Sequence, residues 1–445
     1  MKNAGRRCQG KKLTRRNFFR LAGGSALSLT LPFVGRLASS SSRTLRIGGI
    51  FSLTGPNSPV GRTIRDGARI AIERINTDGG IAGAAALELI MMDGKTSQSG
   101  ASDAARRLAN RGDVSFVLGP LIGTHGAASQ PILAAAGIPQ IFFGTAVGFT
   151  ERHDRYPLSI RFGTSTALQT APILKYAHDV RDDRKLFLLA PNNQQGRDFR
   201  RVLAKQMGKL SRAELVGAEF YPPFNRDFSS LFTRAVNSGA DGLVVGTGIP
   251  PDLVSIAREF HRQGVSTRDF SYYTGQTPNG SVGFYEGAVE QGIGSGIIYS
   301  WHYERGSYGR EFERDHPPRE AEDMESAFVE EFGAPPDSPP SASWGWGSVR
   351  ILKQAIEGLA NERSTSFVLS LLDSGRLPRE TISYILPSGK SAESGPEFST
   401  PFGNAGFLAC GQFNVRLGVA TFRGKKNLLL KDRGYGEDIL GPLCP

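Results

Sequence analysis

Short apolar runs alternate with helical stripes along the first third of the chain. Between successive runs, apolar residues recur every three or four positions, as on one face of an amphipathic helix. The runs themselves are too short to be helices and are typical of buried strands. The repeated order of strand, crossover helix and strand predicts an α/β protein with a doubly wound parallel sheet. The predicted strands are Leu45–Phe51, Leu87–Met92, Val114–Leu118 and Ile138–Phe143.

The last two of these strands end in loops of small and hydroxylated residues. The third strand leads to Gly123 and Thr124, and the fourth leads to Thr145 and Ala146. In open α/β sheets, ligands bind outside the carboxyl ends of the strands. Free N–H groups at the start of each following helix also favour an anion there. We therefore expect a binding site at these two loops, with His125 as a loop histidine that faces solvent or the rim of the site.

The alternation of strands and helices begins again after Gly163. This second set of elements can close a sheet of its own, so we predict two α/β lobes rather than one large sheet. We expect lobe 1 to contain residues 42–163 and 299–395, and lobe 2 to contain residues 164–298 and 396–445, including a C-terminal extension. The strands predicted for the second set are Leu186–Ala190, Leu215–Phe220, Gly242–Gly246 and Phe270–Thr274.

The last third of the chain has a less regular pattern. Residues 303–323 are strongly charged, which predicts a surface insertion. Apolar residues at helical spacing over Trp344–Leu359 predict a long helix. Residues 387–406 contain many Gly, Ser and Pro and are typical of a loop, after which we expect two or three short strands.

The first forty residues differ in composition from the rest of the chain. They carry nine Lys or Arg and no Asp or Glu, so that the formal net charge falls from +11 to +2 without them. The high pI is therefore weak evidence for nucleic-acid binding. Arg15 and Arg16 precede a mildly apolar run, Leu21 to Val34, that is too short to span a bilayer. We interpret residues 1–41 as a signal peptide that resembles a twin-arginine leader, with an ordinary secretory signal or a basic tail as the alternative.

Motifs expected of an enzyme or a metal site are missing from the sequence. The six histidines never fall at metal-ligand spacing, and Cys410 and Cys444 form no CxxC pair. We find no nucleophile elbow, no P-loop and no HExxH motif. The sequence thus predicts neither catalysis nor a cofactor or metal. In an oxidising compartment Cys410 and Cys444 can form a disulfide, and two free thiols are the alternative.

Several short motifs follow one another in a characteristic order. IGGIFSLTG stands at Ile47–Gly55, AGIP at Ala136–Pro139 and FSTPFG at Phe398–Gly403. In this order they resemble the Leu/Ile/Val-binding family of periplasmic receptors for ABC transporters. The likeness covers most of residues 44–415. It implies a type I periplasmic binding fold, in which two lobes joined by three crossovers enclose a small-molecule ligand.

The resemblance also implies ligand contacts in the first lobe. Gly123 and Thr124 stand where N–H and hydroxyl groups hold a ligand carboxylate. Thr145 and Ala146 stand where backbone groups share that carboxylate and the amino group of the ligand. Val60 takes a place where amino-acid receptors can have an aromatic lid.

In the second lobe the resemblance points to Gln195, Ile249 and Gln276. Gln195 occupies a position often held by Tyr, and Ile249 lies in the loop after Gly242–Gly246. Gln276 stands where amino-acid receptors of the family place a carboxylate for the ligand's ammonium. A neutral amide cannot supply that charge-assisted bond. A carboxylate without an amine, an amide or a urea-like solute therefore suits the site better than an α-amino acid, unless Asp252 or Glu286 substitutes.

The family implies an exported receptor that binds a small organic solute and hands it to an ABC permease. We expect the mature protein to be a monomer that closes around its ligand and makes or breaks no bond. A first alternative is a sensor of the same fold that signals to a membrane kinase. A second and less favoured alternative is an enzyme.

Overall fold

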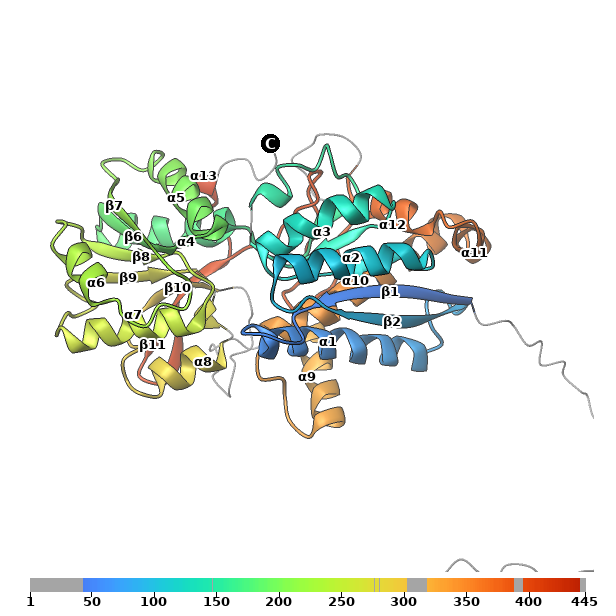
Figure 1. Ribbon diagram of the computed structural model, residues 1–445, viewed down its shortest axis with the longest axis horizontal. Helices are drawn as coiled ribbons and strands as arrows, with labels where there is room; N and C mark the ends of the chain where they lie inside the picture. Colours follow the sequence, from blue (N-terminus) through green and yellow to red (C-terminus); the bar gives the residue numbers. More distant parts are fainter. Residues whose placement is uncertain are drawn as a thin grey trace, which may run out of the picture. The chain divides into compact units, whose positions relative to one another are not determined.

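The computed structural model describes residues 43–145, 147–275, 277–279, 281–301, 318–387 and 395–440 (Figure 1). These residues belong to one compact unit of the chain, Ser42–Pro445. The predicted leader lies outside the described residues. Within the described residues, no helix is long and apolar enough to cross a membrane.

A five-stranded sheet is built from the first third of the chain, and the sequence predicts four of its five strands. All its strand pairs are parallel, in the order β2-β1-β3-β4-β5. Alternate residues of a strand face opposite sides of a sheet. In β1, Leu45 and Ile47 accordingly pack in one core cluster and Ile50 packs in another. The strands are β1 (Arg43–Phe51), β2 (Ala85–Asp93), β3 (Phe116–Leu118), β4 (Gln140–Phe142) and β5 (Ser159–Arg161).

Helices cover both faces of this sheet (Figure 1). On one face, Gly67 and Gly345 let two helices approach closely, because a Cβ atom at Gly345 would stand 1.9 Å from the carbonyl oxygen of Ile64. That face is covered by α1 (Ser58–Thr77), α9 (Arg319–Phe332), α10 (Pro339–Arg363), α11 (Thr365–Asp373) and α12 (Leu377–Ile385), and the other face by α2 (Gln98–Arg111) and α3 (Gly123–Ala135).

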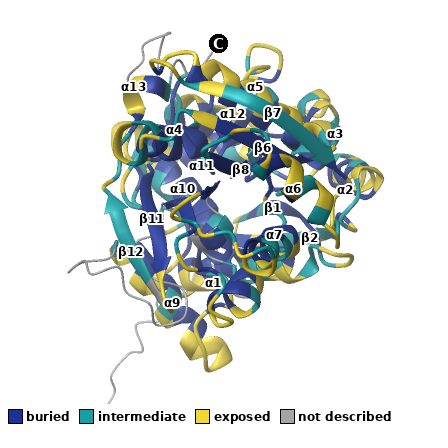
Figure 2. Cartoon of the chain, turned by 90° about the vertical axis from the view of Figure 1, so that its left-hand side faces the viewer, coloured by how far each residue is buried: buried dark blue, intermediate teal, exposed yellow. Residues whose placement is uncertain are grey.

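A seven-stranded sheet contains the second set of predicted strands, in the order β12-β11-β10-β9-β8-β6-β7. The strands β6 to β10 pair in parallel, whereas β11 is antiparallel to β10 and to β12. Figure 2 shows β11 as buried and β12 as intermediate, consistent with its place at the edge of the sheet. The strands are β6 (Lys185–Pro191), β7 (Glu214–Tyr221), β8 (Gly242–Val245), β9 (Ser271–Thr274), β10 (Ile298–Trp301), β11 (Gly418–Arg423) and β12 (Lys426–Lys431).

The two faces of this second sheet also carry separate core clusters. One cluster contains residues of the first two helices after Gly163, and the other contains residues of the helices after β7 and β8. The helices are α4 (Thr166–Tyr176), α5 (Gln194–Met207), α6 (Ser229–Val236), α7 (Pro250–Arg262), α8 (Val282–Phe284) and α13 (Glu437–Leu440). Short 3-10 or π turns are η1 (Val147–Phe149), η2 (Ala177–Arg181), η3 (Thr277–Asn279) and η4 (Tyr285–Val289).

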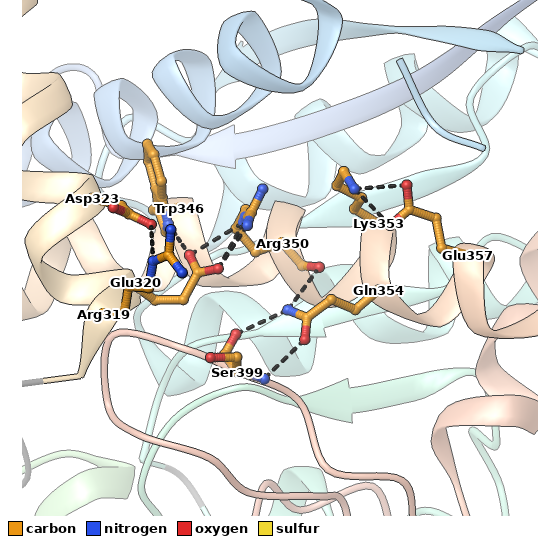
Figure 3. Close-up of polar contacts among 9 residues, drawn as sticks. All are labelled: Arg319, Glu320, Asp323, Trp346, Arg350, Lys353, Gln354, Glu357 and Ser399. Carbon is orange, nitrogen blue, oxygen red and sulfur yellow. Dashed lines mark hydrogen bonds and ion pairs between the residues drawn. The ribbon is translucent and has the colours of Figure 1, made fainter. Parts of the chain in front are cut away.

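The charged stretch 303–323 is only partly described, and its last residues are no surface insertion. Helix α9 begins at Arg319, and Glu320 is 6% exposed. Its carboxylate accepts hydrogen bonds from Trp346 Nε1 at 2.8 Å and from Arg350 Nη2 at 2.7 Å (Figure 3). The prediction was wrong for Glu320, because these partners from α10 compensate a charge that composition alone places at the surface, whereas Arg319, Glu322 and Asp323 are exposed. Residues 302–317 lie outside the described part.

Two segments that join the sheets are bonded to each other near Gly163. The N–H of Arg161 donates to Gly411 O at 2.7 Å, and the N–H of Phe413 donates to Arg161 O at 3.0 Å. The side chain of Gln412 donates to Gly163 O at 2.8 Å. Residues between 398 and 415 pack in the core of the first sheet, whereas β10 belongs to the second sheet. The lobe boundaries at residues 163, 298 and 395 stay a prediction.

Cys410 is buried and disulfide-bonded. Cys444 lies outside the described residues, so pairing between these two cysteines stays a prediction. Of the two or three short strands expected after residue 406, the structure has two, β11 and β12.

Candidate functional site

The first candidate loop is the start of α3, directly after β3. Ile122 is the N-cap and offers no side-chain cap. The first turn is closed by the N–H groups of His125 and Gly126, which donate to Ile122 O at 3.0 Å. The N–H groups of Gly123 and Thr124 precede this pattern, as is usual at a helix N-terminus, and both residues are half-buried. They can therefore donate to a ligand oxygen, together with the Thr124 hydroxyl group.

The second candidate loop follows β4 and contacts the first one. A Cβ atom at Gly144 would stand 2.2 Å from Leu121 O. The two loops therefore lie so close together that Gly144 has no room for a side chain. The carbonyl oxygen of Thr145 accepts from the N–H of Thr166 at 3.1 Å and from its hydroxyl at 3.2 Å. These contacts place Thr145 beside the start of α4. Ala146 lies outside the described residues.

Two further residues of this region, Val60 and His125, have different environments in the structure. Val60 is in the first turn of α1, after β1, and packs half-buried against the core of the first sheet. His125 is only 6% exposed, and this burial lowers its pKa to about 4. It is therefore a neutral core histidine at pH 7, and the expectation of a loop histidine facing solvent or the rim was wrong. We call Gly123, Thr124 and Thr145 the first half-site.

Three loops of the second sheet meet at the carboxyl ends of β6, β8 and β9. A Cβ atom at Gly248 would stand 3.2 Å from Gln195 Nε2 and 3.8 Å from Thr277 Oγ1. The predicted residue Gln195 thus lies beside Gly248, although 53 positions separate them in the printed sequence. Thr277 was not selected from the sequence, where only its position after a predicted strand could have pointed to it.

The loop Thr247–Ile249 is held by its own hydroxyl group and by Thr277. The N–H of Ile249 donates to Thr247 Oγ1 at 3.0 Å, and Thr277 Oγ1 donates to Thr247 O at 3.5 Å. Gly248 is exposed at this point. We call Gln195, Gly248, Ile249 and Thr277 the second half-site. Gln276 lies outside the described residues.

The acidic residues considered as substitutes for a missing carboxylate are placed differently. Asp252 is 0% exposed, and Glu286 is exposed on η4. The aromatic side chains near the loops are all core residues with at most 3% exposure. They are Phe142, Phe143, Phe149, Tyr272 and Tyr273.

An ion pair joins the segment after the first half-site to the helix of Gln195. Glu151 follows η1, and its carboxylate accepts from Arg201 Nη1 at 2.9 Å and from Nη2 at 3.3 Å. Arg201 also lies 3.5 Å from Asp198 Oδ1 in the same helix, α5. Arg161 is fully buried, which lowers its pKa to about 9, while the charges of Asp198 and Glu151 act in the opposite direction.

Neither half-site offers a metal centre. Among the described residues, no group of three or more His, Cys, Asp or Glu side chains is placed to hold a metal ion. The groups that the two half-sites present are backbone N–H, hydroxyl and carboxamide groups. Such groups can bind an organic anion or amide through neutral hydrogen bonds.

Comparison with known proteins defines the class. A sequence profile of the periplasmic binding protein family matches residues 44–418. The chain therefore belongs to this family, in which its relatives are Leu/Ile/Val-binding proteins, and the resemblance found in the sequence is confirmed.

Curated relatives are similar over about half of the chain. The Leu/Ile/Val-binding protein BraC3 of Rhizobium johnstonii is 25% identical over 226 residues, which cover 49% of this chain and 58% of the relative. The Leu/Ile/Val-binding protein of Citrobacter freundii is 24% identical over 249 residues, covering 56% and 64%. The chain thus spans less than two thirds of the length of these relatives.

Solved structures of low sequence identity share the fold. The branched-chain amino-acid transporter substrate-binding protein LivJ of Streptococcus pneumoniae, in complex with isoleucine, has a TM-score of 0.67 at 20% identity, covering 88% of this chain and 100% of that one. A solute-binding protein of an ABC transporter from R. palustris, in complex with 4-hydroxybenzoate, has a TM-score of 0.68 at 16% identity, covering 88% and 96%. These similarities confirm the predicted type I periplasmic binding fold.

Proposed function

We propose that this protein is an exported substrate-binding protein of an ABC importer of the branched-chain amino acid and amide class. It would bind a small organic solute between two lobes built on the two sheets and deliver it to the permease as a monomer. The observation that carries this proposal is the pair of half-sites at the carboxyl ends of both sheets. Membership of the periplasmic binding protein family supports it.

The chemistry of the half-sites favours a particular kind of solute. Gly123 and Thr124 can hold an oxyanion or carbonyl oxygen at the start of α3. Across the site, Gln195 and Thr277 offer neutral amide and hydroxyl groups. None of these residues is acidic, and Gln276 is neutral in the sequence. An enclosed ammonium group would lack a counter-charge there, so we favour a carboxylate without an amine, an amide or a urea-like solute.

Closure between lobes would supply the mechanism. Ligand contacts made on both sheets at once would favour the closed arrangement by their own free energy. The bonded segments at Arg161 and Gln412 are the natural pivot, because they join the sheets and are buried. The ion pair between Glu151 and Arg201 would add to closure at the surface.

A calorimetric panel tests the proposed ligand class. The mature protein would be unfolded, dialysed and refolded to remove any bound solute, then titrated with leucine, valine, benzoate, 4-hydroxybenzoate, isobutyramide and urea. We expect an acid or amide of this panel to bind at least tenfold more tightly than leucine and valine. Tighter binding of leucine would overturn the ligand class. Chemical turnover of any bound solute would overturn the proposal that the protein is a receptor.

Export is proposed to depend on the paired arginines of the leader. Replacing Arg15 and Arg16 by Lys keeps the charge and should leave uncleaved precursor in the cytoplasm. Fractionation of cells that express the variant and the unchanged protein measures this. Normal export of the variant would mean that the leader works as an ordinary secretory signal.

A further inference from the structure

Asp252 is an acidic residue that the structure buries completely. It lies in the first turn of α7, three residues after Ile249, and its exposed fraction is 0%. Neither of its carboxyl oxygens meets the geometry of a hydrogen bond to a described residue. Because buried carboxylates are normally paired or fully hydrogen-bonded, this one needs a physical explanation.

The groups that face Asp252 come from the end of β7. The hydroxyl group of Tyr221 and the N–H of Phe224 both act on the carboxyl group and stabilise its ionised form. Tyr221 is 1% exposed, and its hydroxyl group likewise falls outside hydrogen-bond geometry to the described residues. The two polar groups thus face each other in a buried environment without a full hydrogen bond.

Among the residues that the structure describes, none supplies a cation that neutralises this carboxyl group. Tyr272 of β9 is the other titratable group beside it, and its hydroxyl donates to Leu253 O at 3.1 Å. On the helices packed against α7, Arg234 and Glu286 are exposed. Burial is the largest influence on Asp252 and raises its pKa to about 7. The carboxyl group therefore changes its protonation near neutral pH.

The loop that Asp252 faces carries an exposed aromatic side chain in an unusual conformation. Phe224 is 49% exposed and has a φ of +62°. A bulky residue with positive φ is strained and persists only where its surroundings hold it. The loop lies beside the loop after β6, because the N–H of Asn192 donates to Tyr221 O at 2.6 Å. Phe224 is thus at the same end of the sheet as the second half-site.

Asp252 is also connected to the second half-site through Thr247. The hydroxyl group of Thr247 accepts from the N–H of Ile249 and acts on the Tyr221 hydroxyl. Ile249 itself is the N-cap of the helix that carries Asp252, and its carbonyl accepts from the Asp252 N–H at 3.1 Å. The carboxyl group therefore lies between the loop after β7 and the loop after β8.

We propose that Asp252 is a positioning residue: its carboxyl group is accommodated between the Phe224 loop and the Thr247–Ile249 loop while it is neutral, and both loops then stay closed at the rim of the second half-site. Ionisation of the buried group favours local opening of both loops toward water. The inference rests on the proposed function only in that these two loops would border a bound ligand. The positioning itself is a property of the unliganded protein.

The direction of the pH dependence follows from linkage. In an opened loop Asp252 regains an ordinary pKa near 4, and in the closed loop it is near 7. The closed form therefore binds the extra proton between these values, and its protection is full below about pH 4. Protection falls as pH rises toward 7, by up to tenfold per pH unit, and levels off above it.

Amide hydrogen exchange on the unliganded protein, read by mass spectrometry, tests the proposal. Peptides that cover residues 221–227 and 247–253 would be followed from pH 5 to pH 9, with intrinsic exchange rates divided out. We expect protection factors to fall at least tenfold between pH 5 and pH 7 and then to stay level. In Asp252→Asn, which keeps the shape without the charge, they should not change with pH. In Tyr221→Phe the fall should extend to higher pH, since the lost hydroxyl no longer stabilises the ionised carboxylate.

Asp183→Asn is the matched control. Asp183 also has a raised pKa and faces a tyrosine of the same sheet, Tyr273, but it precedes β6 and so lies at the opposite end. This variant should keep the wild-type exchange profile in both loops. A flat wild-type profile, or the same slope in Asp252→Asn, would overturn the proposal. Because no solute is present, the result is independent of whether the panel above finds a ligand.

Discussion

Gly248 is the position at which a single added methyl group tests the second half-site most directly. It is exposed where three loops meet, and its backbone conformation is one that alanine can adopt. In Gly248→Ala the new Cβ atom would stand 3.2 Å from Gln195 Nε2 and 3.8 Å from Thr277 Oγ1. The nearer of these atoms is the end of a flexible side chain, so the fold should tolerate the change.

The cost should instead appear in ligand binding. The methyl group occupies space between the donors of Gln195 and Thr277, and a ligand that touches both must shift or compress. Overpacking of a fitted site costs about 1–3 kcal/mol. Such a cost corresponds to roughly 5- to 150-fold weaker binding. The pair of measurements is the dissociation constant by calorimetry, with the solute selected by the panel, and the midpoint of thermal unfolding.

Gly208→Ala is the control for the loss of a glycine in the same part of the chain. Gly208 ends α5, and a Cβ atom there would stand 3.5 Å from Ala204 O, an ordinary contact. This variant should bind like the wild type. If Gly248→Ala also binds like the wild type while both proteins stay folded, the solute does not reach the junction of these loops. The second half-site would then be assigned wrongly.

Three further outcomes follow from contacts outside the half-sites. In a double-mutant cycle, Glu151→Gln and Arg201→Gln should show a coupling of about 0.2–1 kcal/mol in chemical unfolding that shrinks in 1 M salt, and additivity would mean that the pair contributes nothing. Burial lowers the pKa of His125 from 6.5 to about 4, so the free energy of unfolding should fall as pH drops from 6.5 to 4. Urea titrations of His125→Gln should show a smaller fall, and an equal fall would contradict the burial of His125. Gly345→Ala should lower the free energy of unfolding by about 1–3 kcal/mol, because its Cβ atom would clash with Ile64 O; unchanged stability would mean that α1 and α10 separate easily.

Periodicity predicted most of both sheets because their strands are buried on two faces. Runs such as Leu186–Ala190 are apolar throughout, and in the structure they lie inside β6. Strand β5 was not predicted, since its three residues include a fully buried arginine that no hydrophobic pattern reveals. Helices α11 and α12 were also missed, because each has only nine residues, which is too short for a helical period to stand out.

The candidate site could be predicted only as far as strand ends show it. Thr124 and Thr145 were selected because ligands of open α/β sheets bind where strands end. The contact of Gln195 with Gly248 depends on the order of strands in the sheet, which the sequence does not display. His125 was misjudged because its burial depends on how α3 packs, and a histidine after a glycine-rich loop gives no sign of that.

The buried ionisable groups explain why charge in this sequence is a poor guide to its site. Arg161, Glu320 and Asp252 are all at most 6% exposed, yet their burial is compensated in different ways. Arg161 is bonded to Gln412 between the two sheets, and Glu320 is bonded to a tryptophan and an arginine. Asp252 has no such partner among the described residues and is best accommodated in its neutral form. The residues assigned to the two half-sites include no acid and so present no counter-charge to an ammonium group, which is the same conclusion that a neutral residue at position 276 suggests from the sequence alone.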